Sequence, residues 1–395
     1  MRLLFMLLLS LLFTLTNLHH ALANSVISQP TIEIAPVDQA LTFARTNDEH
    51  GKKTILVTSF KDNIISGHDL SNAFDKGDSD AIDLFHRYGY EHIRNMLQNK
   101  QRFPIIQVPL IQLDIPVDLA DKHIAVGTNY REHAEETDVT KTPFLFSKRV
   151  IPTRWNAGVT SQSRALDYEA EVAMVALNDI KHSTAPYQIG LMLCNDLSDR
   201  EILMHNVDPK NIESGKGFAQ GKSAPGLLPV GNLFLIPNAT DPFLERLTIQ
   251  LSVNDVIRQQ AKVKQLIWRR QDVFNEIWRN NQRVWQFNGS PIQLLSDPNT
   301  IPKRTLILTG TPAGTVFQGI PFTTKLKGVG QWLISGMKQS VQYYVVENYL
   351  AEYAANYLQN RDQVTVVAPF LGTLSNRISK THIVNAQTSN ESVHH

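Results

Sequence analysis

The fold is decided by the stretch Leu166-Asp167-Tyr168-Glu169-Ala170-Glu171-Val172-Ala173-Met174-Val175. Its second half is apolar and β-prone, which predicts a strand that runs into a hydrophobic core. Side chains alternate between the two faces of a strand, so Glu169 and Glu171 should point the same way. At a rise of about 3.3 Å per residue, they should lie roughly 7 Å apart.

Two carboxylates on one face beside a buried run repel each other and lose hydration. A divalent hard cation prefers oxygen ligands and would relieve both costs, so Glu169 and Glu171 are candidate metal ligands. The alternative is a solvated strand edge with two surface glutamates, because glutamate is mostly exposed in proteins. Features elsewhere in the chain have to decide between these interpretations.

The first residues have the pattern of a secretory signal peptide. Met1-Arg2 supplies a positive charge, a short apolar run extends from Leu3 to Leu15, and Ala21-Leu22-Ala23 is an A-x-A cleavage site. The run is shorter than the ~20 apolar residues that a membrane span needs. We therefore expect cleavage near Ala23, a periplasmic or secreted protein, and no stable membrane insertion after cleavage.

Composition limits the class of protein. Cleavage after Ala23 would leave 395 − 23 = 372 residues, enough for two domains or for one large domain with a smaller companion. The net charge of +1, with interspersed signs, gives no reason to expect a nucleic-acid partner or an anionic membrane. The single cysteine, Cys194, excludes an internal disulfide and ends an apolar run, so it should be a small buried hydrophobe.

The distribution of residue types along the chain suggests two domains. We expect a companion domain at residues 24–118, in which Pro104 and Pro109 keep their segment from being a central strand. A catalytic domain should span residues 119–380, and residues 381–395 should form a disordered tail. Apolar and aromatic residues recur at helical spacing over about 325–360, which predicts an amphipathic insertion, kinked near Gly336. This insertion could cover the core, dimerise or form a lid over a site.

A second candidate site element follows a short strand at residues 124–127. On a helix, His133 and Glu136 are three residues apart and share a face. A carboxylate beside an imidazole fixes its tautomer and raises its basicity, as in a general base that activates water. The alternative is an exposed polar start of a helix.

Three further positions carry potential chemistry. Asp196 follows an apolar strand and can supply a third carboxylate to a metal site, while Lys222 ends a glycine-rich loop and can reach an anionic substrate. That loop fits neither the Walker A nor the G-x-G-x-x-G pattern. In the turn at residues 309–314, backbone N–H groups and the Thr311 hydroxyl can bind a carboxylate. A solvated lysine and a plain turn are the ordinary alternatives.

Six blocks of sequence resemble, in order and spacing, the fumarylacetoacetate hydrolase family. They are Gly127-Thr128-Asn129-Tyr130 with His133 and Glu136, Asp167-Tyr168-Glu169-Ala170-Glu171, Asn195-Asp196-Leu197-Ser198-Asp199-Arg200, Gly221-Lys222-Ser223, Thr309-Gly310-Thr311-Pro312-Ala313-Gly314 and Leu371-Gly372-Thr373-Leu374-Ser375-Asn376. The resemblance spans roughly residues 123–378. It implies an α+β, mainly β fold, a mixed β-sandwich roll of this family's C-terminal type with a smaller N-terminal companion domain, usually in a homodimer.

The resemblance also implies roles for individual residues. Three carboxylates, Glu169, Glu171 and Asp196, would hold Mg²⁺ or Mn²⁺. His133 and Glu136 resemble the pair that activates water. Lys222, a catalytic residue in this resemblance, and Thr311 resemble the groups that hold the substrate's carboxylate and developing oxyanion. Arg200, at the position of the family's arginine, and Tyr130 would also bind the substrate.

The implied activity is hydrolysis of a carbon–carbon bond in an acylpyruvate or another β-diketo acid, a small keto acid that chelates the ion. One alternative is an isomerase, hydratase or decarboxylase of the same fold, and another is a non-catalytic exported protein that binds a metal and a carboxylate. The sequence departs from the family at Asp199, which can neutralise Arg200, and at Leu203, where a substrate-contacting glutamine is frequent. It also departs at Pro302-Lys303-Arg304, which replaces a proline-glycine-aspartate turn.

Overall fold

The computed structural model describes residues 31–49, 51–75, 77, 79–137 and 142–381. The expected signal peptide lies outside these residues, as does the expected tail except for its first residue. From Ile32 onward the chain forms one compact unit. None of the described helices has the length and apolar character needed to cross a membrane.

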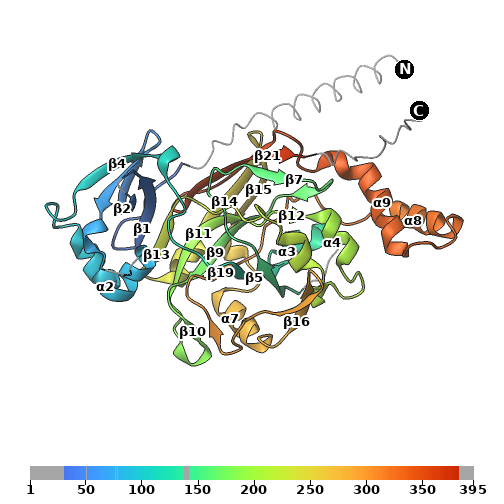
Figure 1. The fold of residues 1–395 in the computed structure, drawn as a ribbon, viewed down its shortest axis with the longest axis horizontal. Helices are drawn as coiled ribbons and strands as arrows, with labels where there is room; N and C mark the ends of the chain where they lie inside the picture. Colours follow the sequence, from blue (N-terminus) through green and yellow to red (C-terminus); the bar gives the residue numbers. More distant parts are fainter. Residues whose placement is uncertain (1–30, 50, 76, 78, 138–141, 382–395) are drawn as a thin grey trace, which may run out of the picture. The chain divides into compact units, whose positions relative to one another are not determined.

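A ten-stranded sheet forms the centre of this unit (Figure 1). In spatial order its strands are β4 (Ile105–Pro109), β3 (Ile64–Asp69), β2 (Gly51–Lys61), β1 (Ala40–Asp48), β13 (Phe234–Pro237), β11 (Ile189–Asn195), β9 (Ala170–Ala176), β19 (Leu306–Leu308), β5 (Lys122–Gly127) and β6 (Phe144–Arg149). Neighbouring strands are antiparallel except β19 and β5, which run parallel.

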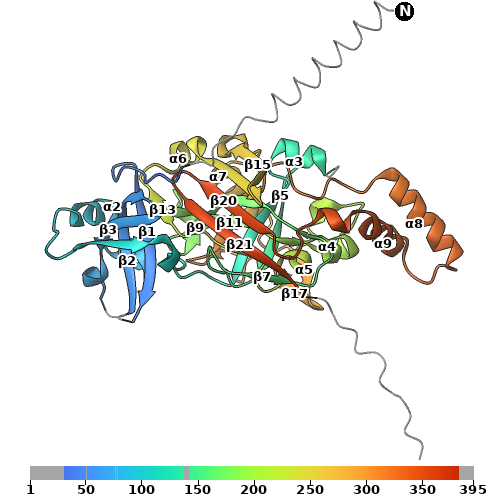
Figure 2. The ribbon, with the colours of Figure 1, turned by 90° about the horizontal axis from the view of Figure 1, so that it is seen from above.

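A second, five-stranded sheet packs against the first. Its order is β15 (Val256–Lys262), β14 (Thr248–Val253), β20 (Gln363–Ala368), β21 (Gly372–Lys380) and β7 (Val159–Ser161). Strands β14, β20 and β21 contact β9 and β11, and Figure 2 shows β20 and β21 lying over them. Three two-stranded pairs complete the sheets: β10 (Ile180–Lys181) with β18 (Thr300–Ile301), β12 (Ser198–Asp199) with β8 (Leu166–Asp167), and β16 (Val284–Phe287) with β17 (Ser290–Gln293).

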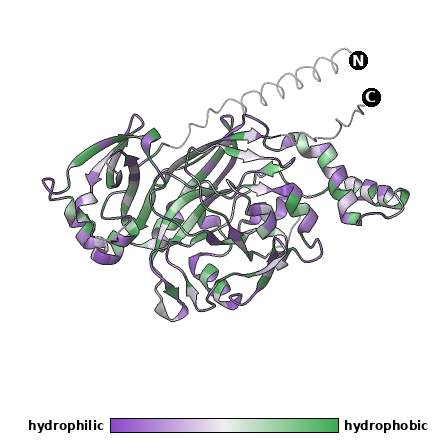
Figure 3. Cartoon of the chain, viewed as in Figure 1, coloured by the Kyte–Doolittle hydropathy of each residue, from purple (hydrophilic) through white to green (hydrophobic). Residues whose placement is uncertain are grey.

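The alternation of side chains in β9 explains why both of its faces are buried. Val172 and Met174 face the core between the two sheets, whereas Ala173 and Val175 face a second core on the opposite side. Figure 3 accordingly shows strands in the middle of the unit coloured largely as hydrophobic. This mixed two-sheet architecture confirms the predicted fold class.

The N-terminal strands share the central sheet with the rest of the chain. Strand β1 pairs with β13 through four residue pairs, from Ala40 with Pro237 to Phe43 with Phe234. The boundary expected near residue 118 therefore does not separate two sheets. Strand β4, with its two flanking prolines, lies at the sheet edge, as the prolines predicted.

Eight α-helices are described: α2 (Ala81–Met96), α3 (Arg131–Glu136), α4 (Arg200–Asn206), α5 (Phe218–Lys222), α6 (Thr240–Arg246), α7 (Arg270–Arg279), α8 (Phe322–Ile334) and α9 (Val341–Tyr353). The expected insertion is an antiparallel hairpin of α8 and α9, not one kinked helix. Gly336 lies in the connection between them with a φ of +72°, which ends the first helix instead of bending it. Figures 1 and 2 place this hairpin at the opposite end of the unit from β1–β4.

Arg304 connects the start of α2 to the central sheet near β19. Just before β19, its guanidinium forms ion pairs with Asp80 and with Asp83 (2.9 Å), two residues at the start of α2, and it donates to the Asp118 carbonyl (3.0 Å). Its φ of +73° occupies the left-handed region that glycine tolerates best. At the departure at residues 302–304, this chain therefore has an ionic anchor.

We predict that Arg304→Gly, which keeps the turn conformation, lowers the free energy of unfolding by about 3–5 kcal/mol at pH 7. The substitution leaves the fully buried carboxylate of Asp80 without its cation. Urea denaturation checks this value. Lys303→Ala is the control, because its ion pair with Asp83 is more exposed and should contribute less than about 1 kcal/mol.

The pH dependence provides a second check on the same variant. Burial alone would raise the pKa of Asp83, but hydrogen bonds from Ser79 and Lys303 and the charge of Arg304 lower it from 3.8 to about 2. Its stabilising contribution is therefore complete above pH 3.8 and is lost as the pH falls toward 2. The difference between wild type and Arg304→Gly should shrink over this interval, and a constant difference would contradict the assignment.

Candidate active site

Three carboxylates meet where the start of β9 lies beside the end of β11. Glu169 immediately precedes β9 and Glu171 lies within it, while Asp196 follows β11. The antiparallel register pairs Ala170 with Asn195, and this pairing brings the residues just outside the two strands together. One oxygen from each of the three carboxylates lies within 4.8 Å of the others, and all three side chains are buried.

Buried charges of alternating sign continue from these carboxylates. Consecutive contacts are 2.9 Å from Asp167 to Arg200, 2.6 Å from Arg200 to Glu169, 2.7 Å from Glu169 to Lys222, 2.8 Å from Lys222 to Asp196 and 2.5 Å from Asp196 to Lys148. Each cation in this series therefore has a carboxylate partner. The series contains equal numbers of cations and carboxylates, so it is neutral as a whole.

Glu171 stands outside this neutral series. Its Oε2 accepts a hydrogen bond from the Gly310 N–H (2.7 Å), and among the described residues no cation forms an ion pair with it. Burial and the charges of Asp196 and Glu169 raise the pKa of Glu171 well above its ordinary value. Burial also acts on Glu169, but Lys222 and Arg200 outweigh it and lower that pKa to about 2.

The donor set fits a hard divalent cation. All three candidate ligands are carboxylates, which suit Mg²⁺, Mn²⁺ and Ca²⁺. Oδ1 of Asp196 accepts no hydrogen bond from the described residues, although Lys148 lies near it, and Glu171 brings the surplus negative charge. An ion bound here would share Glu169 and Asp196 with the ammonium group of Lys222.

The predicted base pair is present on α3. Nδ1 of His133 lies 3.0 Å from Oε1 of Glu136. Because an ionised carboxylate only accepts hydrogen bonds, this contact puts the proton of a neutral imidazole on Nδ1 and leaves a lone pair on Nε2. Burial would raise the pKa of Glu136, but hydrogen bonds from His133, Gly314 and Thr315 lower it, so the carboxylate stays ionised.

Backbone donors of residues 310–317 hold three of these carboxylates. Gly310 donates to Glu171, Gly314 and Thr315 donate to Glu136, and Val316 and Phe317 donate to Asp167 (3.0 and 3.2 Å). The sequence predicted that the turn at residues 309–314 binds a carboxylate. In the structure its N–H groups bind carboxylates of the protein itself.

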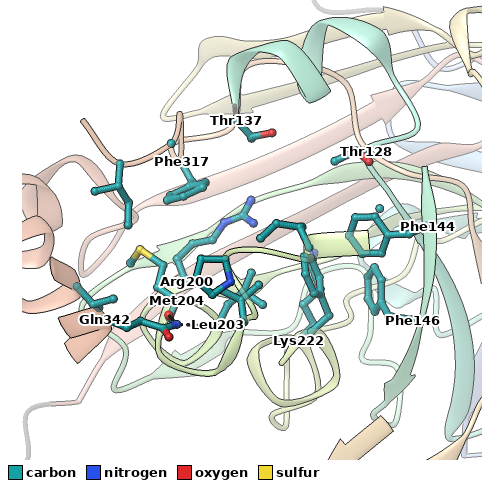
Figure 4. Close-up of a pocket in the computed structure, with 18 of the residues that line it drawn as sticks. Thr128, Thr137, Phe144, Phe146, Arg200, Leu203, Met204, Lys222, Phe317 and Gln342 are labelled. Carbon is teal, nitrogen blue, oxygen red and sulfur yellow. Dashed lines mark hydrogen bonds between the residues drawn. The ribbon is translucent and has the colours of Figure 1, made fainter. Parts of the chain in front are cut away.

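A cavity of about 560 Å³ opens from this site. Among the predicted residues, those that line it are His133, Glu169, Arg200, Lys222 and Thr311. Figure 4 shows Arg200 and Lys222 between the rings of Phe144 and Phe146 on one side and Met204 and Gln342 on the other. Glu171, Asp196 and Glu136 do not line the cavity, but Asp196 contacts the lining residue Lys222 and Glu136 contacts the lining residue His133.

Tyr130 differs from the other predicted substrate contacts. Its side chain is buried, and it is not among the described residues that line the cavity. Burial and the charge of Glu171 raise the pKa of its hydroxyl, so the phenol stays protonated. Its predicted contact with substrate has no support in this geometry.

The two departures near Arg200 have different outcomes. Asp199 does not pair with Arg200. It caps α4 by accepting from the Ile202 N–H (3.0 Å) and accepts from the Ser163 hydroxyl (2.7 Å). Leu203 does line the cavity, so an apolar side chain faces the position where the family often offers an amide.

Sequence reasoning missed Asp167 and Lys148. Asp167 lies in the stretch at residues 166–175, and its carboxylate binds Arg200 and accepts from three backbone N–H groups. Lys148 ends the apolar run of β6, and a lysine that follows such a run is the signal that could have identified it. Its ammonium is fully buried, and burial lowers its pKa although Asp196 opposes this effect.

We predict that Glu171→Gln stabilises the metal-free protein at neutral pH while removing a metal ligand. Because the pKa of Glu171 is raised on folding, the folded protein keeps a proton that the unfolded chain releases, so this residue lowers the free energy of unfolding increasingly as the pH rises above 4.5. Urea denaturation in EDTA should therefore show a larger gain for Glu171→Gln at pH 8 than at pH 5. Added Mg²⁺ should stabilise the wild type far more than the variant.

Glu169→Gln is the matched control, with the opposite expected sign. Neutralising Glu169 leaves Lys222 and Arg200 short of a buried partner, which should destabilise the protein by about 3–5 kcal/mol. Equal destabilisation by both substitutions at pH 8 would show that Glu171 carries no surplus charge.

The chain is similar to known proteins over most of this site. Residues 122–379, more than half of the chain, match the model of the fumarylacetoacetate (FAA) hydrolase C-terminal domain. Oxaloacetate tautomerase Fahd2a, mitochondrial, from Rattus norvegicus is 27% identical over 223 residues, 54% of this chain and 62% of that protein. The homoprotocatechuate catabolism bifunctional isomerase/decarboxylase of Escherichia coli is 26% identical over 216 residues, 52% of this chain and 44% of that protein.

A solved structure supports the fold. The fumarylacetoacetate hydrolase of Exiguobacterium antarcticum superposes with a TM-score of 0.55 at 18% identity, covering 86% of this chain and all of that one. The chain matches less than two thirds of the length of each of the two curated relatives. The match to the family model confirms the resemblance found in the sequence: the chain belongs to the fumarylacetoacetate hydrolase family.

Proposed function

We propose that this chain is an exported, divalent-metal-dependent hydrolase that cleaves a carbon–carbon bond in acylpyruvates. The observation that carries the proposal is His133, which is hydrogen-bonded to Glu136 and lines the same cavity as Glu169 of the buried carboxylate cluster. A base with a free Nε2 beside a site for a chelating keto acid is the minimum that such a hydrolysis needs. Export rests on the N-terminal pattern, and the homodimer implied by the family stays a prediction.

Three side chains in the cavity can hold the head group of the substrate. Arg200 uses Nε and Nη2 for Asp167 and Glu169, and Nη1 has no hydrogen-bond partner among the described residues. Oγ1 of Thr311 accepts from Gln259 Nε2 (2.9 Å), so the hydroxyl proton remains available for donation. Both groups can therefore bind a substrate carboxylate, and Lys222 adds fixed positive charge beside them.

In the proposed hydrolysis, His133 transfers the protons and Glu136 orients it. His133 removes a proton from water through Nε2, and the oxygen of that water forms a bond to the acyl carbonyl carbon. The bond between this carbon and the adjacent methylene carbon breaks, so the products are a carboxylic acid and the enolate of pyruvate. A proton from the imidazolium returns to the enolate carbon. Glu136 stays ionised and holds His133 in the required tautomer.

A bound Mg²⁺ or Mn²⁺ would be held by Glu169, Glu171 and Asp196 and would supply Lewis acidity toward the keto-acid oxygens. Lys222 and Arg200 keep Glu169 ionised, whereas Glu171, whose pKa is raised, would give up its proton when an ion binds. The cluster has one carboxylate more than it has cations, and a divalent ion would compensate this excess.

Keto–enol isomerisation of a keto diacid is the second candidate. It is favoured by the relatives that are named oxaloacetate tautomerase and isomerase/decarboxylase. The same Nε2 could move a proton between carbon and oxygen without activating water. The two functions differ in their products, because isomerisation leaves the carbon skeleton intact.

We predict that the Mg²⁺-loaded protein converts 2,4-dioxo acids to pyruvate and a carboxylic acid. His133→Asn should lower kcat by about 10²–10⁴-fold, because it removes the general base. Binding of oxalate, a mimic of the pyruvate enolate, should change little. Product analysis by NMR and calorimetry with oxalate measure the two effects.

His205→Asn is the matched control. His205 also lies beside a glutamate, Glu347 (3.3 Å), but it does not line the cavity. Its substitution should leave kcat within about twofold. Turnover of oxaloacetate enol with no cleavage of any 2,4-dioxo acid would reject the hydrolase in favour of the isomerase.

A further inference from the structure

The α8–α9 hairpin forms the wall of the cavity that faces the buried charges. Val329 from α8 and Val341, Val345 and Val346 from α9 line the same cavity as His133, Glu169 and Lys222. The hairpin is therefore more than a cover over the core or a free arm. Its inner face bounds the space in which a substrate would lie.

Several contacts hold this wall in place. Arg164 bridges Glu201 of α4 (2.6 Å) and Glu347 of α9 (2.8 Å). Gln342 donates to the backbone carbonyls of Met204 (2.6 Å) and Val207 (3.0 Å) at the end of α4. Val346, Tyr349 and Leu350 of α9 pack in one buried cluster with Met204. The wall is thus part of the packed structure, and its shape is set before a substrate binds.

Within the hairpin, α8 and α9 pack closely at Gly328. A Cβ at this position would lie 2.5 Å from Cγ2 of Val345, a distance that side chains do not adopt. Glycine therefore lets the two helices approach each other. This approach fixes Val345, one of the lining residues, against the backbone of α8.

The buried charged groups that line the cavity gather around Glu169, and most of the remaining lining residues are apolar. The buried cations that line it, Arg200 and Lys222, are both paired with Glu169. Lys210 and Lys325 also line it, but both are exposed. The amide N–H groups of Gln342 are used by backbone carbonyls. A second carboxylate on the substrate would therefore meet no buried cation among the described lining residues, only the solvated ammonium groups of Lys210 and Lys325, whose ion pairs contribute little in water.

The cavity is larger than the head group of the proposed substrate. A volume of about 560 Å³ falls within the range of pockets that enclose ligands of drug size, whereas the pyruvate unit has only a few heavy atoms. The remaining space is bounded by Leu203, Met204 and the hairpin valines. Apolar walls of this kind favour an apolar chain through the hydrophobic effect.

We propose that the hairpin selects monocarboxylic acylpyruvates with a long or bulky apolar acyl chain, which it binds along the cavity, over small or dicarboxylic keto acids. This inference rests on the proposed function for the identity of the head group. The α8–α9 insertion is then the specificity element of the enzyme. The three carboxylates that would hold the metal ion lie apart from the hairpin, at the ends of β9 and β11.

The test uses a series of oxamates, monoamides of oxalic acid that mimic the chelating head of a keto acid and lack the acyl–methylene bond that the proposed reaction breaks. Calorimetry on the Mg²⁺-loaded protein compares oxamate, N-butyl oxamate, N-octyl oxamate and an N-(carboxyalkyl) oxamate of matched length. Each buried methylene contributes about fourfold in affinity (about 0.8 kcal/mol). We expect N-octyl oxamate to bind at least about tenfold more tightly than oxamate, and the dicarboxylic analogue to gain nothing.

Two glutamate substitutions on α8 locate the effect. Val329→Glu places a charge in the cavity wall at a partly exposed position, so the protein should still fold. It should abolish the gain from the octyl chain and leave the binding of oxamate itself unchanged. Ile334→Glu is the matched control, because Ile334 is 90% exposed and does not line the cavity.

The outcomes separate this inference from the proposed function. Affinity that is independent of chain length, a preference for the dicarboxylic analogue, or equal losses from both glutamate variants would overturn the inference. If oxamate fails to bind but N-octyl oxamate binds in a manner that Val329→Glu abolishes, the apolar site stands and only the proposed head-group chemistry fails. Absence of binding throughout the series overturns both.

Discussion

Mutual neutralisation of buried charges is the constraint on which the rest of the site depends. A lone ion in the interior costs several kcal/mol, so each buried cation needs a carboxylate in contact and each carboxylate needs donors. The series from Asp167 to Lys148 meets this requirement pair by pair. Glu171 lies outside the series. Its pKa is raised because it is buried beside Asp196 and Glu169 and forms no ion pair with a cation of the described residues.

One backbone segment connects the carboxylates with the base. Residues 310–317 donate N–H groups to Glu171, Glu136 and Asp167, so a single chain path sets the distance between the metal-ligand side and the imidazole side. Two glycines make this path possible. Gly310 and Gly314 have φ of +98° and +101°, and a Cβ on Gly314 would lie 2.0 Å from the Arg258 carbonyl oxygen. Side-chain chemistry at this site therefore depends on backbone conformation.

The buried charges and the apolar wall of the cavity occupy different parts of the fold. The charged residues lie at the ends of strands of the central sheet and in the loops and short helices beside them, where packing on both faces holds them rigidly. The apolar wall comes from the α8–α9 hairpin, which is attached to α4 through Arg164 and Gln342. Substitutions in the hairpin can alter what the cavity admits without disturbing the carboxylates, because the two regions share the cavity and no ion pair of the central series.

Local patterns in the sequence were sufficient for part of this description. The apolar, β-prone second half of residues 166–175 predicted a buried strand, the three-residue spacing of His133 and Glu136 predicted that they share a face, and the order of six motifs predicted the family and its fold. These features depend on neighbours in the chain or on patterns that repeat in fixed order. The sequence could not show that the N-terminal strands would join the central sheet through β1 and β13, because strand pairing between distant segments leaves no local signal.

What the sequence by itself determined was which residues are chemically able to act: the carboxylates, the imidazole, the lysine at 222 and the arginine at 200. Tertiary structure alone decided how they are used. It moved Tyr130 out of the cavity, turned Asp199 into a helix cap instead of a partner for Arg200, and brought Lys148 and Asp167 into the buried series. It also made the insertion a wall of the cavity. The physical reason is that contact and burial, which set pKa and charge pairing, arise between residues far apart in the chain and exist only once it has folded.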